Sequence, residues 1–379
     1  MTDSRVVTAT QDTAIAWLAE ERRFVQALLV EVEGSAPLPV GAMMLIDDQG
    51  NLEGSITGGC VEGAVVQEAE EMMAAGPSAP AKLLTYGISD ELAGTVGLMC
   101  GGIVHILAHT LTGQTGEIER AALEEHAADR PSAIATMIDG PTAGSRIAIV
   151  GDRALGSLGW GELLDSNVAR EAQGLLEEGK TTLRRFGADG ATLGDDLRVH
   201  IRSYAQPPRM FIFGAIDFSA ALAPFAAQIG YQVTICDARG RFARSARFSS
   251  SATVTVGWPQ DVLRDVELGP RDAVLVFTHD PKFDEPALMA ALGTEAGYIG
   301  ALGSRQTTAD RENRLRLNGV SEGELARIHA PCGLDIGSRT AEETAVSVLA
   351  EIIAARARRG GTPLRMTSGP IHGRDHQAA

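Results

Sequence analysis

The sequence predicts an α/β protein in which an N-terminal α/β domain precedes a C-terminal Rossmann-type domain with a mainly parallel sheet. Three observations predict this class. After residue 209, short apolar runs alternate with helical stretches, which is typical of parallel strands covered by helices on both faces. Before Gln206-Pro207-Pro208 the chain has strand and helix patterns of its own, and these prolines mark a boundary. The length of 379 residues is sufficient for two domains.

The N-terminal domain is expected to span residues 1–207. The helix expected at 61–75 has apolar residues at helical spacing, and Gly76-Pro77 ends it. The other elements expected in the first part are a helix at 12–22 and strands at 24–32, 42–46 and 103–107, and residues 52–56 lead into the glycine turn before Cys60. From about residue 111 the pattern is less regular, and it predicts a helix at 115–128 and strands at 134–138, 146–150 and 199–204. The sequence indicates no internal repeat.

The C-terminal domain is expected at 208–360, and residues 361–379 are expected to be a flexible tail because they are rich in Gly, Pro and polar residues. Its expected strands are 210–213, 232–236, 253–256, 273–277 and 298–301. The closing helix begins with Thr340 and Glu343 at capping-box spacing and continues with an apolar stripe.

The composition excludes several classes of protein. The net charge of −16 and the lack of a basic stripe exclude a nucleic-acid partner. There is no run of about 18 apolar residues and no signal peptide, so we expect no membrane span and a cytoplasmic location. The four cysteines lack the Cys-x-x-Cys spacing that is typical of zinc sites, so no metal site is predicted.

The Rossmann fingerprint is incomplete. Gly214 follows the first expected strand and Asp237 ends the second, but Ile216 and Ser219 replace the second and third glycines. Asp217 is expected to be the N-cap of the following helix and to repel a phosphate, and Pro224 is expected to kink that helix. The sequence therefore predicts that NAD(P) does not bind at this turn, and the domain can equally be a packing and contact scaffold.

Two cysteines lie beside paired glycines, in Gly58-Gly59-Cys60 and Cys100-Gly101-Gly102. Adjacent glycines allow backbone N–H groups to converge on an anion. Cys60 is expected at the start of a helix, where the dipole favours the thiolate, a soft ligand that suits a molybdenum–sulfur centre bearing a phosphate. The alternative is two glycine turns with small buried thiols.

Further candidates follow the expected strands of the second domain, at the edge where α/β proteins bind ligands. They are Asp237, Arg239, His279, Asp280, Ser304, Arg305 and Asp335. The alternative is that these residues cap helices and make hydrogen bonds within loops.

Several long motifs resemble the xanthine dehydrogenase accessory family, XdhC/CoxI. In the first domain they are Gly34-Ser35-Ala36-Pro37, the segment from Gly54 to Glu62, and Cys100-Gly101-Gly102. In the second they are Asp237-Ala238-Arg239, Thr278-His279-Asp280-Pro281, the segment from Tyr298 to Arg305 and the segment from Ala330 to Gly337. The resemblance covers about residues 12–110 and 209–355. Leu38, Ile216 and Asp217 depart from the family's pattern.

The resemblance implies a cofactor chaperone rather than a turnover enzyme. Such a protein binds the molybdenum cofactor (molybdopterin) transiently, protects it during sulfuration and delivers it to a molybdenum hydroxylase such as xanthine or carbon monoxide dehydrogenase. Cys60 and Cys100 match the family's glycine-flanked cysteines. The implied partners are this client and a cysteine desulfurase, and we expect a homodimer because homodimers are the commonest assembly.

Two alternatives stay open at this point: an NAD(P)-dependent oxidoreductase acting on a small metabolite, and a non-catalytic scaffold for a molybdoenzyme. Xanthine dehydrogenase itself is excluded. Its two plant-type iron–sulfur clusters need four cysteine ligands each, and this chain has four cysteines in total.

Overall fold

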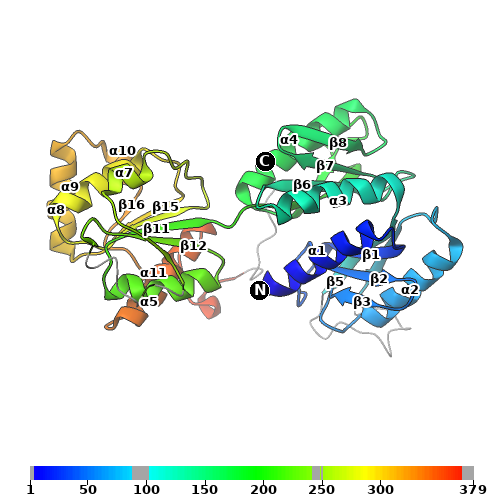
Figure 1. The fold of residues 1–379 in the computed structure, drawn as a ribbon, viewed down its shortest axis with the longest axis horizontal. Helices are drawn as coiled ribbons and strands as arrows, with labels where there is room; N and C mark the ends of the chain where they lie inside the picture. Colours follow the sequence, from blue (N-terminus) through cyan, green and yellow to red (C-terminus); the bar gives the residue numbers. More distant parts are fainter. Residues whose placement is uncertain (1–3, 88–101, 241–247, 249–250, 369–379) are drawn as a thin grey trace. The chain divides into compact units, whose positions relative to one another are not determined.

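The computed structural model describes residues 4–87, 102–240, 248 and 251–368. The chain divides into two compact units, one up to Gln206 and one from Pro207 (Figure 1). Unit one contains two sheets and unit two contains one, and each unit has its own hydrophobic cores. In the part of the chain that the structure describes, no helix is both long and apolar enough to cross a membrane.

The first half of unit one is a five-stranded antiparallel sheet in the order β3-β2-β1-β5-β4. Its elements are α1 (Ser4–Ala19), β1 (Phe24–Glu33), β2 (Met43–Asp47), β3 (Leu52–Gly54), α2 (Glu62–Ala75), β4 (Lys82–Tyr86) and β5 (Ile103–Leu111). Apolar residues of α2 such as Val65 and Ala69 share a core with Val25, Ala27 and Leu29, which alternate along one face of β1. This alternation fixes the face on which α2 lies.

The second half of unit one is another five-stranded antiparallel sheet, in the order β8-β7-β6-β10-β9. Its elements are α3 (Gly113–Ala127), β6 (Ser132–Met137), β7 (Arg146–Val150), β8 (Arg153–Ser157), α4 (Glu162–Glu178), β9 (Thr182–Phe186) and β10 (Leu197–Tyr204). Here Val168 and Ala172 of α4 share a core with Ala133, Ala135 and Met137 of β6.

The two halves of unit one therefore repeat one topology. Each has a helix, three strands, a second helix and two further strands, and the strands assemble in the same spatial order. The expectation of no internal repeat was wrong. Sequence inspection misses the repeat because the halves share an apolar pattern rather than residue identities, and because the connection after β4 is longer than the one after β9.

A shared core joins the two halves on the faces opposite α2 and α4. Trp17 of α1 and Phe24 of β1 come from the first half, and Ile118 of α3 and Tyr204 of β10 come from the second. Helices α1 and α3 also contact each other. Unit one is thus one compact body made of two similar halves.

Unit two contains a parallel six-stranded sheet in the order β13-β12-β11-β14-β15-β16, which confirms the predicted Rossmann-type fold. Its strands are β11 (Arg209–Phe213), β12 (Gln232–Cys236), β13 (Thr253–Thr255), β14 (Ala273–Val276), β15 (Tyr298–Ala301) and β16 (Ile328–His329). Its helices are α5 (Asp217–Gln228), α7 (Pro259–Leu263), α8 (Pro281–Leu292), α9 (Arg305–Leu317), α10 (Glu322–Leu325), α11 (Ala341–Arg356) and the short 3-10 helix η2 (Leu364–Met366). Helices α5 and α11 pack on one face, and α8 and α9 pack on the other.

The structure also has elements that sequence patterns did not indicate, among them β4, β8, α4, β9 and β16, and α1 begins earlier than expected. The buried positions of α4, such as Leu164, Val168 and Ala172, do recur at helical spacing. Polar residues and a glycine between them weaken the signal.

Candidate functional site

Three glycine-containing segments from different parts of unit one meet at one end of its first sheet. Gly102 packs so closely that an added Cβ would lie 2.2 Å from the Ser35 carbonyl oxygen. At Gly58, an added Cβ would lie 4.0 Å from the Pro37 Cβ. The half-buried Cys60 packs on the core beneath. The structure thus brings Gly58 and Gly102 to the same segment, residues 35–37, with Gly59 and Cys60 next to Gly58 in the chain. Cys100 and Gly101 lie outside the described residues.

The carboxylate of Glu62 gathers the hydrogen-bond donors of the loop that carries Cys60. Its Oε1 accepts from the Ser55 hydroxyl (2.7 Å) and from the N–H groups of Ile56 (3.2 Å) and Thr57 (2.8 Å). Its Oε2 accepts from the Thr57 hydroxyl (2.8 Å) and from the N–H groups of Gly59 (2.9 Å) and Val61 (3.1 Å). The N–H groups of this loop do converge on an anion, and that anion is the Glu62 carboxylate of the same chain.

These contacts keep Glu62 ionised. Partial burial by itself raises the pKa of Glu62, but the hydrogen bonds from Thr57 and Ser55 outweigh it and lower the pKa to about 2. Helix α2 begins at Glu62, with Val61 as its N-cap, so Cys60 precedes the helix rather than opening it. The expectation that the glycine-flanked amides are open to a phosphate needs correction, because the Gly59 N–H already donates to Glu62.

The second half of unit one contains a reduced version of this loop. The Gly159 N–H donates to the Ser157 hydroxyl at 3.0 Å, as the Gly58 N–H donates to Ser55 at 3.0 Å. The Leu158 N–H donates to Asp165 at 3.0 Å. Asp165 lies in the first turn of α4, as Glu62 does in α2. This second loop holds Trp160 and has no cysteine.

His105 is a polar residue at this end of the sheet that sequence reasoning missed. Its Nε2 lies 3.1 Å from Glu33 Oε1 and its Nδ1 lies 3.0 Å from the Thr85 hydroxyl. The three residues are on β5, β1 and β4, which are neighbours only in the folded sheet. No local motif in the sequence could have indicated this group.

The predicted site residues of unit two all follow the carboxyl ends of its strands. Asp237 and Arg239 come after β12, His279 and Asp280 after β14, Ser304 and Arg305 after β15, and Asp335 after β16. Asp280 caps α8 by accepting from the Lys282 N–H (3.1 Å), and Ser304 caps α9 by accepting from the Thr307 N–H (3.1 Å). His279, Arg305 and Asp335 are exposed.

Asp237 and Arg239 form a closed pair. Both carboxylate oxygens of Asp237 accept from the Arg239 guanidinium, at 2.9 and 2.8 Å, and Oδ2 also accepts from the Ala215 N–H at 2.9 Å. Partial burial by itself raises the pKa of Asp237, but the hydrogen bonds from Arg239 and Ala215 outweigh it and lower the pKa. A ribose would have to displace Arg239 to reach this carboxylate.

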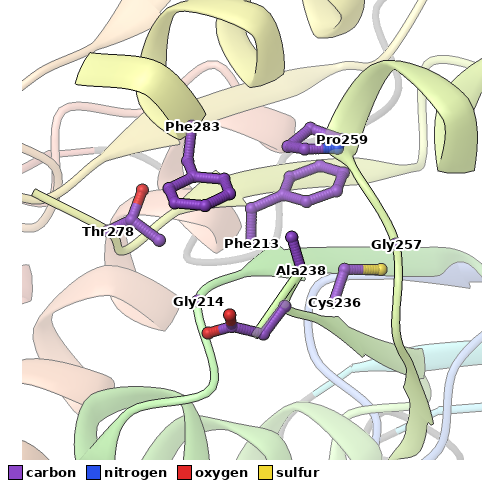
Figure 2. Close-up of a pocket in the computed structure, with 9 residues that line it drawn as sticks. Phe213, Gly214, Cys236, Ala238, Gly257, Pro259, Thr278 and Phe283 are labelled. Atoms are coloured by element: carbon purple, nitrogen blue, oxygen red, sulfur yellow. The ribbon is translucent and has the colours of Figure 1, made fainter. Parts of the chain in front are cut away.

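A small pocket lies beside this pair, where the strand order changes direction between β11 and β14. Figure 2 shows the rings of Phe213 and Phe283 next to each other, with Pro259 beside Phe213. Trp258 stacks on Phe283 with ring centroids 4.7 Å apart. The cavity measures about 10 Å³, which is room for one water molecule and too small for a nucleotide base.

The turn after β11 differs from expectation in one respect. Ile216 is extended (φ −121°, ψ 177°) and is the N-cap of α5, so Asp217 is the first helical residue rather than the cap. Pro224 lies inside α5, which ends at Gln228. Asp217 still places a carboxylate in the first turn, where a phosphate would have to lie.

Glu351 of α11 is a second residue that sequence reasoning missed. Its carboxylate accepts from the Tyr298 hydroxyl (2.5 Å) and the Gly333 N–H (2.6 Å), and lies 3.2 Å from His329 Nδ1. Partial burial raises the pKa of Glu351, but the hydrogen bonds from His329 and Tyr298 outweigh it and lower the pKa to about 2. Glu351 therefore anchors the loop that carries Asp335.

The described residues contain no group of three or more His, Cys, Asp or Glu side chains that could hold a metal ion. The chemistry available in unit one is a free thiol in a glycine-lined loop, and that in unit two is a closed ion pair beside a small aromatic pocket.

Comparisons with known proteins match nearly the whole chain. The model of the XdhC and CoxI family matches residues 17–87 and 125–187, and that of the XdhC Rossmann domain matches residues 210–352. A Bacillus subtilis protein, named as a probable subunit of xanthine dehydrogenase, is 30% identical over 351 residues, which are 90% of this chain and 96% of that protein. The Escherichia coli molybdenum cofactor insertion chaperone PaoD is 27% identical over 343 residues, 90% of this chain and 86% of that protein.

A solved structure has the same fold. It is described as a xanthine dehydrogenase from Bacillus halodurans, and it matches with a TM-score of 0.65 and 23% identity over 94% of this chain and 98% of that one.

Proposed function

This chain belongs to the XdhC and CoxI family, and from that premise we propose that it is an accessory protein for molybdoenzyme maturation whose cargo is the molybdenum cofactor. The name of PaoD, a molybdenum cofactor insertion chaperone, supports this role. The four cysteines argue against an enzyme chain with two plant-type iron–sulfur clusters, despite the name of the Bacillus subtilis relative.

The observation that carries the proposal is the half-buried, free thiol of Cys60 where three glycine segments meet. A thiolate is a soft ligand that suits a molybdenum–sulfur centre. The exposed Gly58 and Gly59 leave the backbone before Cys60 bare of side chains, so a flat ligand can approach closely. Cys100 and Gly101 belong to the same proposed site through their motif.

The occupied amides limit how the cargo is held. Glu62 already accepts from Gly59 and Thr57, so the phosphate of the cofactor is held by groups other than these two amides. The cofactor stays bound only transiently, because one thiol and a few backbone contacts give a modest affinity. A molybdenum hydroxylase is the proposed client. A cysteine desulfurase that supplies the sulfur, and a homodimeric state, are further parts of the proposal.

We also propose that unit two does not bind NAD(P). Asp217 in the first turn of α5, the pairing of Asp237 with Arg239 and the small cavity all oppose an ordinary dinucleotide site. Its strand-end residues, Asp237, Arg239, His279, Asp280, Ser304, Arg305 and Asp335, stay candidates for contact with the cargo or the client. The non-catalytic scaffold is the competing function, since it needs no cargo.

The test is the molybdenum content of the protein purified from cells that make the cofactor. We expect Cys60→Ala to retain about tenfold less molybdenum per chain than the wild type, a change of about 1.4 kcal/mol. Cys236→Ala, which removes a buried thiol in unit two, is the control and should retain as much as the wild type. Equal retention in Cys60→Ala, or no molybdenum in the wild type, would favour the scaffold.

A further inference from the structure

The loop from Ser55 to Val61 is organised around one side chain. Six hydrogen bonds reach the Glu62 carboxylate, three to each oxygen, from two hydroxyl groups and four backbone N–H groups. The Gly58 N–H is held indirectly, because it donates to Ser55, whose hydroxyl donates to Glu62. The carboxylate therefore fixes the path of the backbone on both sides of Cys60.

The backbone N–H of Cys60 differs from the other N–H groups of this loop. Among the described residues its N–H makes no hydrogen bond, whereas every other N–H from Ile56 to Val61 makes one. The thiol and this N–H belong to the same residue. Both are therefore available to a ligand, whereas Glu62 and Ser55 accept from the other N–H groups of the loop.

The second half of unit one has a shorter connection at this place in its fold, residues 158–161 against residues 55–61 in the first half. There the carboxylate of Asp165 accepts from a single loop amide, Leu158. The shorter loop therefore joins strand to helix with one hydrogen bond to an acidic side chain. The first half has five additional donors on its carboxylate, and it is the half that carries the cysteine.

We propose that Glu62 is the positioning residue for Cys60: its carboxylate draws in the surrounding amides and so holds the half-buried thiol and the N–H of Cys60 in a fixed position for the cargo. This inference rests on the proposed function of Cys60. Glu62 does not touch the cargo itself and acts through the loop. Its contacts are stronger than ordinary ones, because hydrogen bonds to a charged acceptor are worth more than neutral ones.

The first test measures Cys60 without any cofactor. Glu62→Gln keeps the shape of the side chain, but its NH₂ group faces N–H donors and the charge is lost. We expect the rate of iodoacetamide reaction at Cys60, followed by peptide mass spectrometry, to rise about tenfold because the loop opens. Asp165→Asn is the matched control and should leave the rate unchanged. An unchanged rate in Glu62→Gln would overturn the proposal.

The second test asks whether Glu62 acts through Cys60. In a double-mutant cycle on molybdenum retention, Glu62→Gln should lower retention, and the double variant should retain as much as Cys60→Ala alone. A further loss in the double variant would show an independent role and contradict the inference. If Cys60→Ala retains normal molybdenum, the proposed function fails, while the alkylation result still decides the positioning.

If Glu62→Gln fails to fold, Ser55→Ala tests the same positioning role of Glu62. It removes the 2.7 Å hydrogen bond to Glu62 and the acceptor of the Gly58 N–H while keeping the carboxylate. We expect Cys60 to react about threefold faster in Ser55→Ala, since fewer donors hold the loop. A wild-type rate in this variant would reject the positioning role.

Discussion

Arg146 and Glu119 form a fully enclosed ion pair within unit one, with 2.5 Å between Nη1 and Oε2 and no exposed surface on either side chain. Glu119 lies on α3 and Arg146 opens β7, both in the second half. Gln26, on β1 of the first half, donates to Glu119 at 2.9 Å, and Arg202 of β10 also donates to this carboxylate. The network therefore joins the two similar halves through one carboxylate.

Glu119→Gln should destabilise the protein by about 3–5 kcal/mol, because it leaves the guanidinium groups of Arg146 and Arg202 buried without a countercharge. Urea unfolding at pH 7 measures this loss. The control is Glu125→Gln, which breaks the pair with the exposed Arg130 and should cost less than about 1 kcal/mol. Similar small losses in both variants would show that the buried pair adds nothing to stability.

Glu351 should make stability depend on pH. Its pKa is about 2 in the folded protein against an ordinary 4.5, so its contribution is present in full above about pH 4.5. The contribution is lost as pH falls through the folded pKa. We expect Glu351→Gln to be about 2 kcal/mol less stable than the wild type at pH 7 and the gap to narrow below pH 4.5.

Chemical unfolding at several pH values from 7 to about 2.5 would follow this gap, with Glu177→Gln, at an exposed position on α4, as the control. A gap that stays constant down to the lowest pH would contradict the assignment of Glu351 as the anchored carboxylate.

Gly102→Ala should destabilise unit one by about 1–3 kcal/mol, because the new Cβ would overlap the Ser35 carbonyl oxygen. Gly63 offers a matched comparison in α2, where an added Cβ would meet nothing within 4 Å among the described residues. Gly63→Ala should stabilise the helix by up to about 1 kcal/mol. The two thermal midpoints should therefore move in opposite directions, and a Gly102→Ala variant as stable as the wild type would rule out the close approach.

NAD⁺ and NADP⁺ should bind with dissociation constants above about 10 μM, equivalent to less than about 7 kcal/mol of binding free energy. Ile216→Gly alone should not restore binding, because Asp217 stays in the first turn of α5 and Arg239 still closes Asp237. Isothermal titration calorimetry on both proteins would test this. Tight binding by the wild type, or rescue by the single glycine, would reinstate a dinucleotide site.

Much of this protein follows from local sequence pattern. Short apolar runs alternating with helices predicted the parallel sheet of unit two, and the strand at 146–150 was predicted with the same bounds as β7. The family followed from long motifs such as Gly54 to Glu62, which keep their order along the chain, and the family comparisons confirm it. Periodicity and motifs are properties of short stretches of sequence, so they can be recognised without knowledge of the fold.

The tertiary structure alone decided which groups meet. The pairing of Glu119 with Arg146, the group formed by His105 with Glu33 and Thr85, and the repeat within unit one all depend on strand order. Glu62 was visible in its motif, yet its six hydrogen bonds depend on the path of the loop between β3 and α2. Contacts between distant residues form only after loops close and sheets assemble, and no local pattern encodes the direction in which a loop amide points.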